Sequence, residues 1–392
     1  MPKINSLFKS ILLFAVGLLL ALLLVLLISQ TIWAHYDRVD QVQVPFDAKL
    51  VDIQSHGTNV EKGNLLGIQP WLATSDYTNT ATLTAKFSSY LMAAREQGWL
   101  SEKTVVAFPE YTGTWLVATG EKKSIYSERK SDDAMTTVAL THLPEFTYRL
   151  LTAPAVHDKA KWAIFSVKAK QAAKDYQAVF GELSHRFGVN IVAGSILLPE
   201  PQLVNGELVV TPGKRLFNVS AVFGPDGHII PPLVIKVFPI LDELEFIDTG
   251  KTASLPVFDT KAGKLGVLIC ADAWYPENYV ALKKSGADMV VVPSYSAHDR
   301  VWSTLWGGYN GGAQPADVDS RDIGKITEGD AWMKYAIPQR TQAAGIKAGM
   351  NVFLRGELWD LGSDGATIRV SGTDTGKENV VQGATLTNLW LN

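Results

Sequence analysis

The sequence predicts a mixed α/β (α+β) sandwich preceded by one N-terminal transmembrane helix. Residues 11–28 form an apolar run without a charge or a proline. Beyond this run, short β-rich segments alternate with helical stretches, which is the pattern of helices packed on a sheet. Of the 392 residues, 47% are apolar and 19% are charged. This composition supports a packed core and excludes a disordered, collagen-like or coiled-coil chain.

The apolar run is long enough to cross a bilayer. As a helix that rises about 1.5 Å per residue, it measures roughly 27 Å, close to the thickness of the hydrocarbon layer. A cleaved signal peptide is the alternative interpretation. It fits less well, because the run is longer than the apolar region of most signal peptides and Thr31–Ala34 contains no clear small-x-small cleavage site. We therefore expect residues 11–28 to lie in the lipid bilayer.

The charges beside the run predict its orientation. Lys3 and Lys9 precede it, whereas Asp37, Arg38 and Asp40 follow it. Because basic flanks tend to stay in the cytoplasm, the N-terminus is expected inside and the body of the protein outside the cytoplasm. In a Gram-negative cell this single-pass protein would be periplasmic.

The predicted organisation is a cytoplasmic tip and anchor at residues 1–40, followed by one domain at residues 45–392. The expected strands of that domain are Leu65–Gln69, Thr104–Phe108, Asn190–Ala193, Phe217–Phe223, Leu233–Val237, Lys264–Ile269 and Met289–Val292. The expected helices are Thr80–Glu96, Lys161–Phe187, Tyr275–Ser285 and Ala331–Ala348. Gly224–Gly227 has the Pro-Asp-Gly composition of a tight turn, so it is expected to join two strands in a hairpin.

Composition also excludes several classes of function. The formal net charge of −3 gives no electrostatic basis for binding nucleic acid. Cys270 is the single cysteine, which excludes an intrachain disulfide and a cysteine-rich zinc site. The glycine-rich run Gly307–Gly312 matches no dinucleotide-binding pattern.

Three reactive side chains are predicted at the ends of three separate strands. Glu110 follows the apolar run Val105–Phe108, Lys236 ends Leu233–Lys236, and Cys270 ends a run that begins at Gly266. The carboxyl ends of strands are common places for functional sites in open sheets. Each residue alone has an ordinary structural explanation, as a small core residue or a charge at the rim. The joint pattern is what indicates a site.

These residues and their surroundings resemble the nitrilase superfamily of carbon–nitrogen hydrolases. Phe108–Tyr111 resembles the family's glutamate motif, Asn218–Gly227 followed by Lys236 its hairpin and lysine motif, and Ile269–Glu277 its cysteine motif. Further short motifs fall in the expected order at Gly67–Pro70, Val192–Ser195 and Gly286–Asp288. The resemblance covers roughly residues 62–370. It implies a four-layer α-β-β-α sandwich and no metal or organic cofactor, and a homo-oligomer is compatible with it.

The three residue types also form a coherent catalytic set on chemical grounds. A thiol must lose its proton to attack an amide or nitrile carbon, and Glu110 can act as the general base for Cys270. Lys236 and the backbone N–H of Ala271 can stabilise the resulting oxyanion. After the amine leaves, the acyl group remains on the thiol as a thioester until water releases it.

Several neighbouring residues are expected to support this set. The family carries a second glutamate after the lysine, and spacing from Gly250 favours Glu243 over Glu245. It would hold Lys236 or the substrate through charge-assisted hydrogen bonds. Asp272 and Glu277 are expected to brace the cysteine loop. The residues proposed to line the pocket are Tyr111, Trp274 and Tyr295.

Two insertions and one substitution depart from the family pattern. The insertions lie near residues 113–159 and 298–330, and segments of this length are typical of lids, binding surfaces or disordered loops. Arg340–Ala344 stands where the family often has Arg-Ala-x-Glu, so the support of the site from this segment is open. Substrate identity therefore does not transfer from any one branch of the family.

Three functional interpretations follow from the sequence. The favoured one is a membrane-anchored carbon–nitrogen hydrolase of the amidase or nitrilase type, which takes a small-molecule amide or nitrile. The second is an N-acyltransferase, in which an amine instead of water accepts the acyl group, as in the family branch that acylates lipoproteins. That branch carries a membrane domain of several spans, which is missing here. The third is a scaffold without catalysis, which the joint presence of Glu110, Lys236 and Cys270 disfavours.

Overall fold

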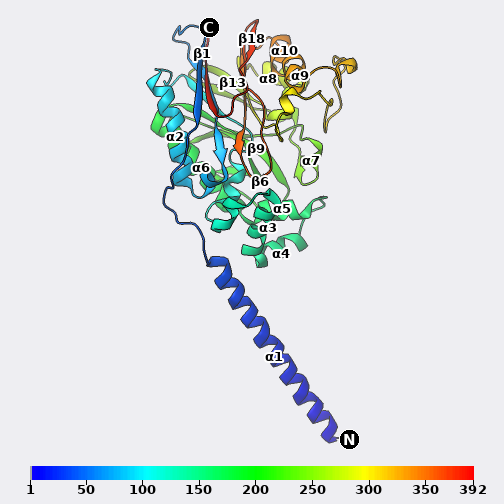
Figure 1. Cartoon of the computed structure of the whole chain (residues 1–392). Coiled ribbons are helices and arrows are strands. Elements are labelled where there is room, and N and C mark those ends of the chain that lie inside the picture. Colours follow the sequence, from blue (N-terminus) through cyan, green and yellow to red (C-terminus); the bar gives the residue numbers. More distant parts are fainter. Residues whose placement is uncertain (1) are drawn as a thin grey trace.

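The computed structural model describes residues 2–392 and has a long helix attached to a body of two stacked sheets (Figure 1). Helix α1 (Pro2–His35) projects away from the body, and the side chains of residues 11–28 are exposed. The part from Phe8 to His35 is long and apolar enough to cross a membrane, and it contains an 18-residue window with a mean hydropathy of 3.4. The predicted N-terminal apolar helix is therefore present, and it extends beyond residues 11–28 at both ends.

Among the described residues, the larger sheet has nine strands. Its main path is β1 (Leu50–His56), β19 (Ala384–Trp390), β2 (Asn64–Gln69), β4 (Thr104–Phe108), β5 (Asn190–Ala193), β9 (Leu216–Phe223) and β10 (Ile229–Ile235). Two short strands, β6 (Ile196–Pro199) and β11 (Ile247–Asp248), also pair with β9. β2, β4 and β5 run parallel to one another, so their carboxyl ends meet at one edge.

The smaller sheet has six strands within the described part of the chain. Their order is β12 (Val257–Thr260), β13 (Gly263–Val267), β14 (Met289–Ser294), β15 (Ala348–Phe353), β17 (Ile368–Ser371) and β18 (Asp374–Lys377). Two small ribbons pair β3 (Trp71–Ala73) with β16 (Arg355–Glu357), and β7 (Gln202–Val204) with β8 (Glu207–Val209).

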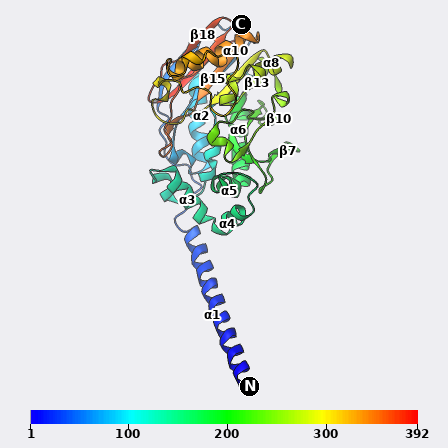
Figure 2. The same ribbon diagram turned by 90° about the vertical axis from the view of Figure 1, so that its right-hand side faces the viewer.

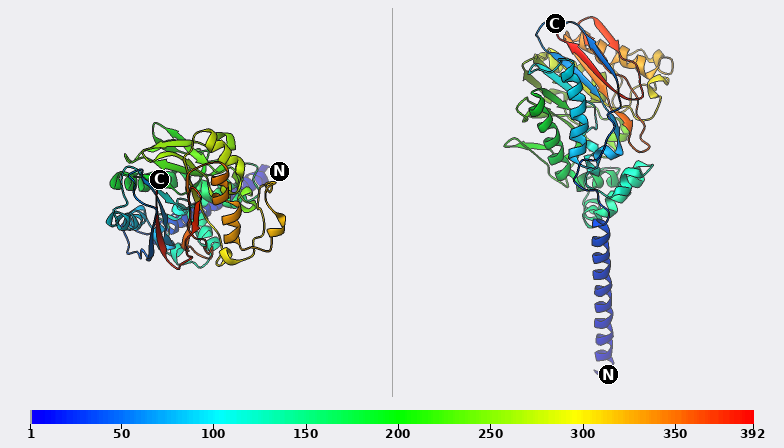
Figure 3. Two further views of the ribbon diagram at one scale, coloured as in Figure 1. Left: turned by 90° about the horizontal axis from the view of Figure 1, so that it is seen from above. Right: turned by 60° about the vertical axis from the view of Figure 1, so that its left-hand side comes forward.

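The two sheets pack face to face, and helices cover their outer faces. α2 (Thr80–Glu96) and α6 (Ala169–Phe187) cover the larger sheet; α8 (Pro276–Lys284) and α10 (Ile337–Ala343) cover the smaller one. In the right-hand view of Figure 3, cyan α2 and orange α10 lie on opposite sides of the strands. This is the predicted four-layer α-β-β-α sandwich.

Close packing explains why these segments form these layers. Phe87 of α2 lies 4.7 Å from Phe108 of β4, measured between ring centroids, and Phe180 of α6 lies 5.4 Å from Phe108. Between the sheets, a β-carbon at Gly67 of β2 would lie 2.7 Å from the sulfur of Met350 in β15. Glycine at this position therefore allows the two sheets to approach.

Several predicted elements occur with their predicted bounds, and two predicted helices are wrong. α2, β4 and β5 start and end as expected, and Gly224–Gly227 joins β9 to β10. The helix expected at 161–187 is divided into α5 (Lys159–Val167) and α6. The helix expected at 331–348 is divided into α9 (Glu328–Tyr335) and α10, because Ala336 is not helical and α10 begins at Ile337 with Pro338 in its first turn; Ala348 already belongs to β15.

The two insertions differ in structure. The segment near 113–159 was expected as a long loop, but it contains α3 (Ser131–Thr141) and α4 (Leu143–Leu151). The segment 298–330 is mostly irregular, with the short 3-10 turns η6 (Val301–Ser303) and η7 (Ser320–Asp322). Figure 2 places α3 and α4 at the end of the body from which α1 emerges.

Candidate active site

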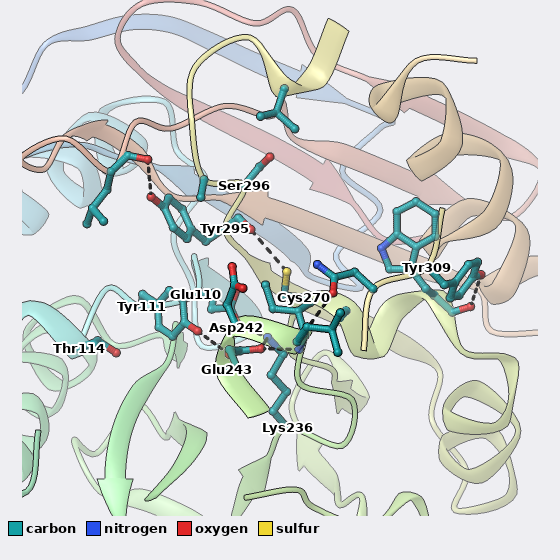
Figure 4. A pocket seen from close by; sticks show the side chains of 18 of the residues that line it. Glu110, Tyr111, Thr114, Lys236, Asp242, Glu243, Cys270, Tyr295, Ser296 and Tyr309 are labelled. Atoms are coloured by element: carbon teal, nitrogen blue, oxygen red, sulfur yellow. Dashed lines mark hydrogen bonds and ion pairs between the residues drawn. The ribbon is translucent and has the colours of Figure 1, made fainter. Parts of the chain in front are cut away.

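The structure brings the three predicted reactive residues to one cavity of about 800 Å³ (Figure 4). Glu110 lies two residues after β4, Lys236 directly after β10, and Cys270 three residues after β13. The larger sheet thus supplies the glutamate and the lysine, and the smaller sheet supplies the cysteine. The expected strands around them reached Val237 and Ile269, but β10 ends at Ile235 and β13 at Val267.

A buried charge network connects Lys236 with two carboxylates. Its Nζ atom lies 2.8 Å from Oε1 of Glu110 and 2.5 Å from Oε2 of Glu243, which belongs to the short helix α7 (Leu241–Leu244). All three side chains are at most 5% exposed. The other predicted candidate for the second glutamate, Glu245, is exposed, so the structure places Glu243 beside Lys236.

Asn218 joins the two carboxylates, a role that the sequence analysis did not identify. Its Nδ2 atom donates to Glu110 at 2.9 Å and to Glu243 at 3.0 Å. The signal available in the sequence was an amide side chain inside the hairpin motif, at the start of β9. Tyr111 also donates its hydroxyl hydrogen to Glu243, and the backbone N–H of Ile240 donates to the same carboxylate at 2.9 Å.

Burial and neighbouring charges shift the pKa values of this network. Burial raises the pKa of Glu110, and the negative charge of Glu243 adds to this effect. The positive charge of Lys236 lowers the pKa but is shared between the two carboxylates, so the net shift is upward. Burial also opposes the charges of Lys236 and Glu243, but their mutual attraction outweighs it. The pKa of Lys236 is therefore held well above its usual value, and the pKa of Glu243 below its usual value. Glu110 is the member of the network that most readily accepts a proton.

Cys270 lies at a strained turn with its thiol facing this network. Its backbone has φ of +48°, a conformation that residues with a β-carbon rarely adopt. Its thiol donates to the carbonyl oxygen of Tyr295, with Sγ 3.6 Å from that oxygen. Burial raises the pKa of Cys270 well above its usual value, with the charge of Glu110 adding to the effect. The thiol therefore keeps its proton in the resting protein.

Asp272 holds the turn that carries Cys270. Its carboxylate accepts backbone N–H groups from Val237 at 2.9 Å and from Phe238 at 2.7 Å, both directly after Lys236. Burial raises the pKa of Asp272 to about 7. Asp272 therefore ties the residues that follow Lys236, from the larger sheet, to the turn that carries Cys270, from the smaller sheet. This fixes the positions of Lys236 and Cys270 relative to each other. Glu277, the other expected brace, lies in the first turn of α8.

A second turn fixes Glu110 and Tyr111. The backbone N–H of Tyr111, which has φ of +61°, donates to Oγ of Ser195 at 2.9 Å. Gly194 has φ of +66°, and a β-carbon there would lie 2.1 Å from the carbonyl oxygen of Pro109. Only glycine fits against this loop, so the Gly194-Ser195 pair shapes the position of the glutamate.

Aromatic side chains form much of the remaining wall. The predicted pocket residues Tyr111, Trp274 and Tyr295 all line the cavity, as does Ala271. The insertion at 298–330 supplies Trp306, whose ring stacks on Trp274 with 5.7 Å between centroids. This segment therefore contributes directly to the cavity.

Helix α10 supports the site although it departs from the family pattern. Arg340 is 2% exposed and donates to the carbonyl oxygens of Trp274 at 3.2 Å and of Tyr335 at 3.0 Å. It also forms an ion pair with Asp317 of the 298–330 segment. The arginine thus links the cysteine turn to that insertion.

No group of three or more His, Cys, Asp or Glu side chains within residues 2–392 is arranged to hold a metal ion. The described residues that line the cavity offer one thiol, two ammonium groups and several carboxylates as their reactive groups. These are groups for proton transfer, nucleophilic attack and charge stabilisation.

One protein family and several known proteins are similar to this chain. The family model of carbon-nitrogen hydrolases matches residues 73–308, more than half of the chain. An omega-amidase of Danio rerio is 27% identical over 192 residues, which cover 47% of this chain and 60% of that protein. A chloroplastic omega-amidase of Arabidopsis thaliana is 25% identical over 244 residues, covering 59% of this chain and 58% of the relative. The chain thus spans less than two thirds of the length of both relatives.

The fold also resembles a solved structure. An amidase of the nitrilase superfamily from Nesterenkonia superposes with a TM-score of 0.50 at 15% identity, covering 86% of this chain and 94% of that protein. At this identity the similarity concerns the fold.

Proposed function

The chain belongs to the carbon–nitrogen hydrolase family, and from this membership we propose that it is a membrane-anchored amidase acting through Cys270, Glu110 and Lys236. The observation that carries the proposal is that these three side chains, from separate strand ends of two sheets, converge on one cavity. The two omega-amidase relatives favour an amide over a nitrile as substrate.

In the proposed reaction, Glu110 first takes the proton of the Cys270 thiol while the sulfur attacks the amide carbon. The raised pKa of Glu110 suits this role, because it makes the carboxylate a stronger base at neutral pH. The negative charge that develops on the amide oxygen is stabilised by the ammonium of Lys236 and the N–H of Ala271. Ala271 lies in the first turn of η5 (Cys270–Trp274), where backbone N–H groups are free of helical partners.

Glu110 then gives its proton to the leaving amine, the C–N bond breaks, and the acyl group remains on Cys270 as a thioester. A water molecule attacks the thioester while Glu110 takes one of its protons. The carboxylic acid leaves, and the thiolate recovers a proton from Glu110. Glu243 acts as a positioning residue that holds Lys236 in this cycle through its 2.5 Å contact.

The division of the chain is part of the same proposal. Residues 1–40 would hold the protein in the membrane, with residues 11–28 in the bilayer and the N-terminus in the cytoplasm. Residues 45–392 would form the catalytic domain outside the cytoplasm. The apolar composition and exposure of α1 support the anchor, and the flanking charges support the orientation.

The reaction is tested with full-length protein in detergent and its Cys270→Ala variant. Both are incubated with short aliphatic amides, with and without an amine acceptor, and followed by ammonia release and intact mass. We expect ammonia and a cysteine-linked acyl adduct from the native protein and neither from the variant. Ammonia release that survives Cys270→Ala would contradict the mechanism. An acylated amine formed in preference to the acid would identify a transferase instead of a hydrolase.

The anchor is tested separately in membranes. We expect the full-length protein to stay in the membrane pellet after an alkaline carbonate wash, because a spanning helix is not released by charge reversal. A C-terminal alkaline phosphatase fusion is expected to be active in a bacterial host, since that enzyme requires export. Release by carbonate, or an inactive fusion that is fully expressed, would contradict the anchor or its orientation, respectively.

A further inference from the structure

The base of the body, beside α1, carries apolar side chains that the fold leaves uncovered. No residue of α4 is buried. Leu143, Leu150 and Leu151 of this helix are 37%, 36% and 80% exposed, and Leu140 at the end of α3 is 44% exposed. The charged residues of α4, Glu145 and Arg149, pair with each other at 2.6 Å. The helix is thus amphipathic, with its leucines on one side and its charge pair on another.

One hydrogen bond shows where the exposed apolar side chains of α3 and α4 lie along the length of α1. The side-chain Nε2 of Gln30 donates to the carbonyl oxygen of Leu140 at 2.6 Å. Gln30 lies two residues beyond the apolar run 11–28, which is about 3 Å along the helix. The end of α3 and the start of α4 therefore lie level with the end of the run that would fill the bilayer, as the arrangement in Figures 1 and 2 also shows.

Several direct contacts clamp the end of α1 to the body. Nζ of Lys122 lies 2.5 Å from the carbonyl oxygen of Tyr36 and 4.4 Å from the ring centroid of Trp33. Backbone hydrogen bonds join Val39 to Glu121 at 3.0 Å and Lys123 to Asp37 at 3.0 Å. The position of the body relative to the helix is therefore defined by direct contacts.

Glu121 ties the exposed helices to the same clamp. Its fully buried carboxylate lies 2.8 Å from Nε2 of His142, the residue between α3 and α4, and 2.6 Å from Nζ of Lys168, the residue between α5 and α6. Arg38, just beyond α1, lies 3.8 Å from the same carboxylate. One buried charge thus connects the end of α1 with the junctions of four helices.

We propose that α4, together with Leu140, lies in the boundary between the headgroups and acyl chains of the bilayer, as a second membrane contact beside α1. The proposal rests on the proposed anchoring by α1 and not on the proposed reaction. Burial of apolar area would drive the contact, because the charges of α4 cancel and the chain is slightly acidic overall. Zwitterionic lipid should therefore suffice.

This placement has a consequence for the cavity. α5 packs against α4 and supplies Lys161 and Phe165 to the cavity wall. Only one helix would then separate the cavity from the lipid. The wall of the cavity that α5 forms would then lie close to the membrane surface.

The test measures the depth of single fluorescent labels in full-length protein reconstituted in phosphatidylcholine nanodiscs. In a Cys270→Ala background, Leu151→Cys reports on α4, Leu20→Cys on the centre of α1, and Val280→Cys on α8. Val280 is the matched control, since it is also apolar and 62% exposed but belongs to α8, which lies at the far end of the body in Figure 1. Each site is labelled with an environment-sensitive dye and quenched either by spin-labelled lipid or by iodide in the buffer.

We expect the label at 151 to be quenched at least about threefold more strongly by shallow spin-labelled lipid than the label at 280, and iodide to show the reverse order. Leu143→Cys provides a second position if Leu151→Cys alters the circular dichroism spectrum. Equal iodide access at 151, 143 and 280 would overturn the proposal. If lipid quenches the label at 20 but neither label on α4, the anchor stands and this inference alone fails.

Discussion

Two buried glutamates, Glu110 and Glu121, lie eleven residues apart in the chain and have opposite electrostatic properties. Both are at most 1% exposed, and both accept a hydrogen bond from a lysine, Lys236 at 2.8 Å and Lys168 at 2.6 Å. Burial raises the pKa of Glu110. Burial also acts on Glu121, but the hydrogen bond from His142 and the charge of Lys168 outweigh it and lower its pKa.

The difference lies in how many hydrogen-bond donors and positive groups each carboxylate has to itself. Glu121 has Lys168 and His142 within hydrogen-bonding distance and Arg38 slightly farther away. Glu110 shares its only lysine with Glu243, the second carboxylate on Lys236. A buried glutamate with surplus cations is a fixed charge that holds structure together. A buried glutamate that competes for one cation has a raised pKa and accepts a proton more readily.

The largest expected effect separates the two glutamates by activity. Glu110→Gln should reduce the rate of amide hydrolysis by at least about 100-fold, because an amide cannot act as the general base. Glu121→Gln should retain activity within about tenfold, since it lies outside the cavity. Steady-state ammonia release by both variants measures the ratio. Similar losses of activity in the two variants would contradict the distinction between a catalytic Glu110 and a structural Glu121.

The second effect separates them by stability. Glu121→Gln should lower the free energy of unfolding by about 3 kcal/mol at pH 7, because Lys168 is left buried without its counter-charge. A carboxylate with a lowered pKa stabilises the fold above its unfolded pKa and loses that effect as the pH falls through the folded pKa. The difference between native protein and variant should therefore shrink below about pH 4.5. Urea unfolding in detergent across this range tests it, and a difference independent of pH would contradict it.

The third effect changes the number of carboxylates that share Lys236. Glu243→Gln removes the negative charge that raises the pKa of Glu110, so that pKa should fall. The rate of Cys270 alkylation by iodoacetamide is expected to fall at acid pH, when Glu110 takes up a proton. In the variant this fall should occur at a lower pH than in the native protein. Intact mass spectrometry over a pH series measures it. Glu245→Gln, at the exposed neighbour, is the control that should leave the profile unchanged, and an upward shift in Glu243→Gln would refute the account.

The smallest effect concerns an exposed ion pair that includes neither Glu110 nor Glu121. Lys123 and Asp37 lie 3.4 Å apart with side chains 61% and 46% exposed. Lys123→Ala should change the free energy of unfolding by less than about 1 kcal/mol, because water screens such pairs. The same urea measurement serves here. A loss as large as that of Glu121→Gln would mean that the clamp at the end of α1, and not the buried charge, determines the difference.

Much of the fold could be predicted where local pattern and tertiary packing agree. α2 has its expected bounds because Asn79 caps its N-terminus and its apolar residues face the larger sheet. The helix expected at 331–348 failed, since apolar residues continue across Pro338 into β15 and periodicity alone does not mark the change. α3 and α4 were missed because they are short, so their helical signal is weak without knowledge of what they contact.

The candidate site shows a similar limit. The sequence identified Glu110, Lys236 and Cys270 from strand ends and family motifs, and it favoured Glu243 from spacing. It did not identify Asn218, whose contacts with two carboxylates join residues 108 and 25 positions away in the chain. It also could not show the link from Arg340 to Trp274, because that contact depends on how helix α10 packs on the distant cysteine turn. Such contacts between residues far apart in the chain require the assembled fold.

The backbone of Cys270, with φ of +48°, places stability and chemistry in conflict at one position. A glycine there would adopt this conformation at little cost, whereas a side chain stores strain of about 1 kcal/mol or more. Screening variants of this protein for thermal resistance alone would therefore tend to select against the thiol. Any effort to engineer a more robust form should count activity and melting temperature together, because at this residue the most stable sequence and the functional sequence are expected to differ.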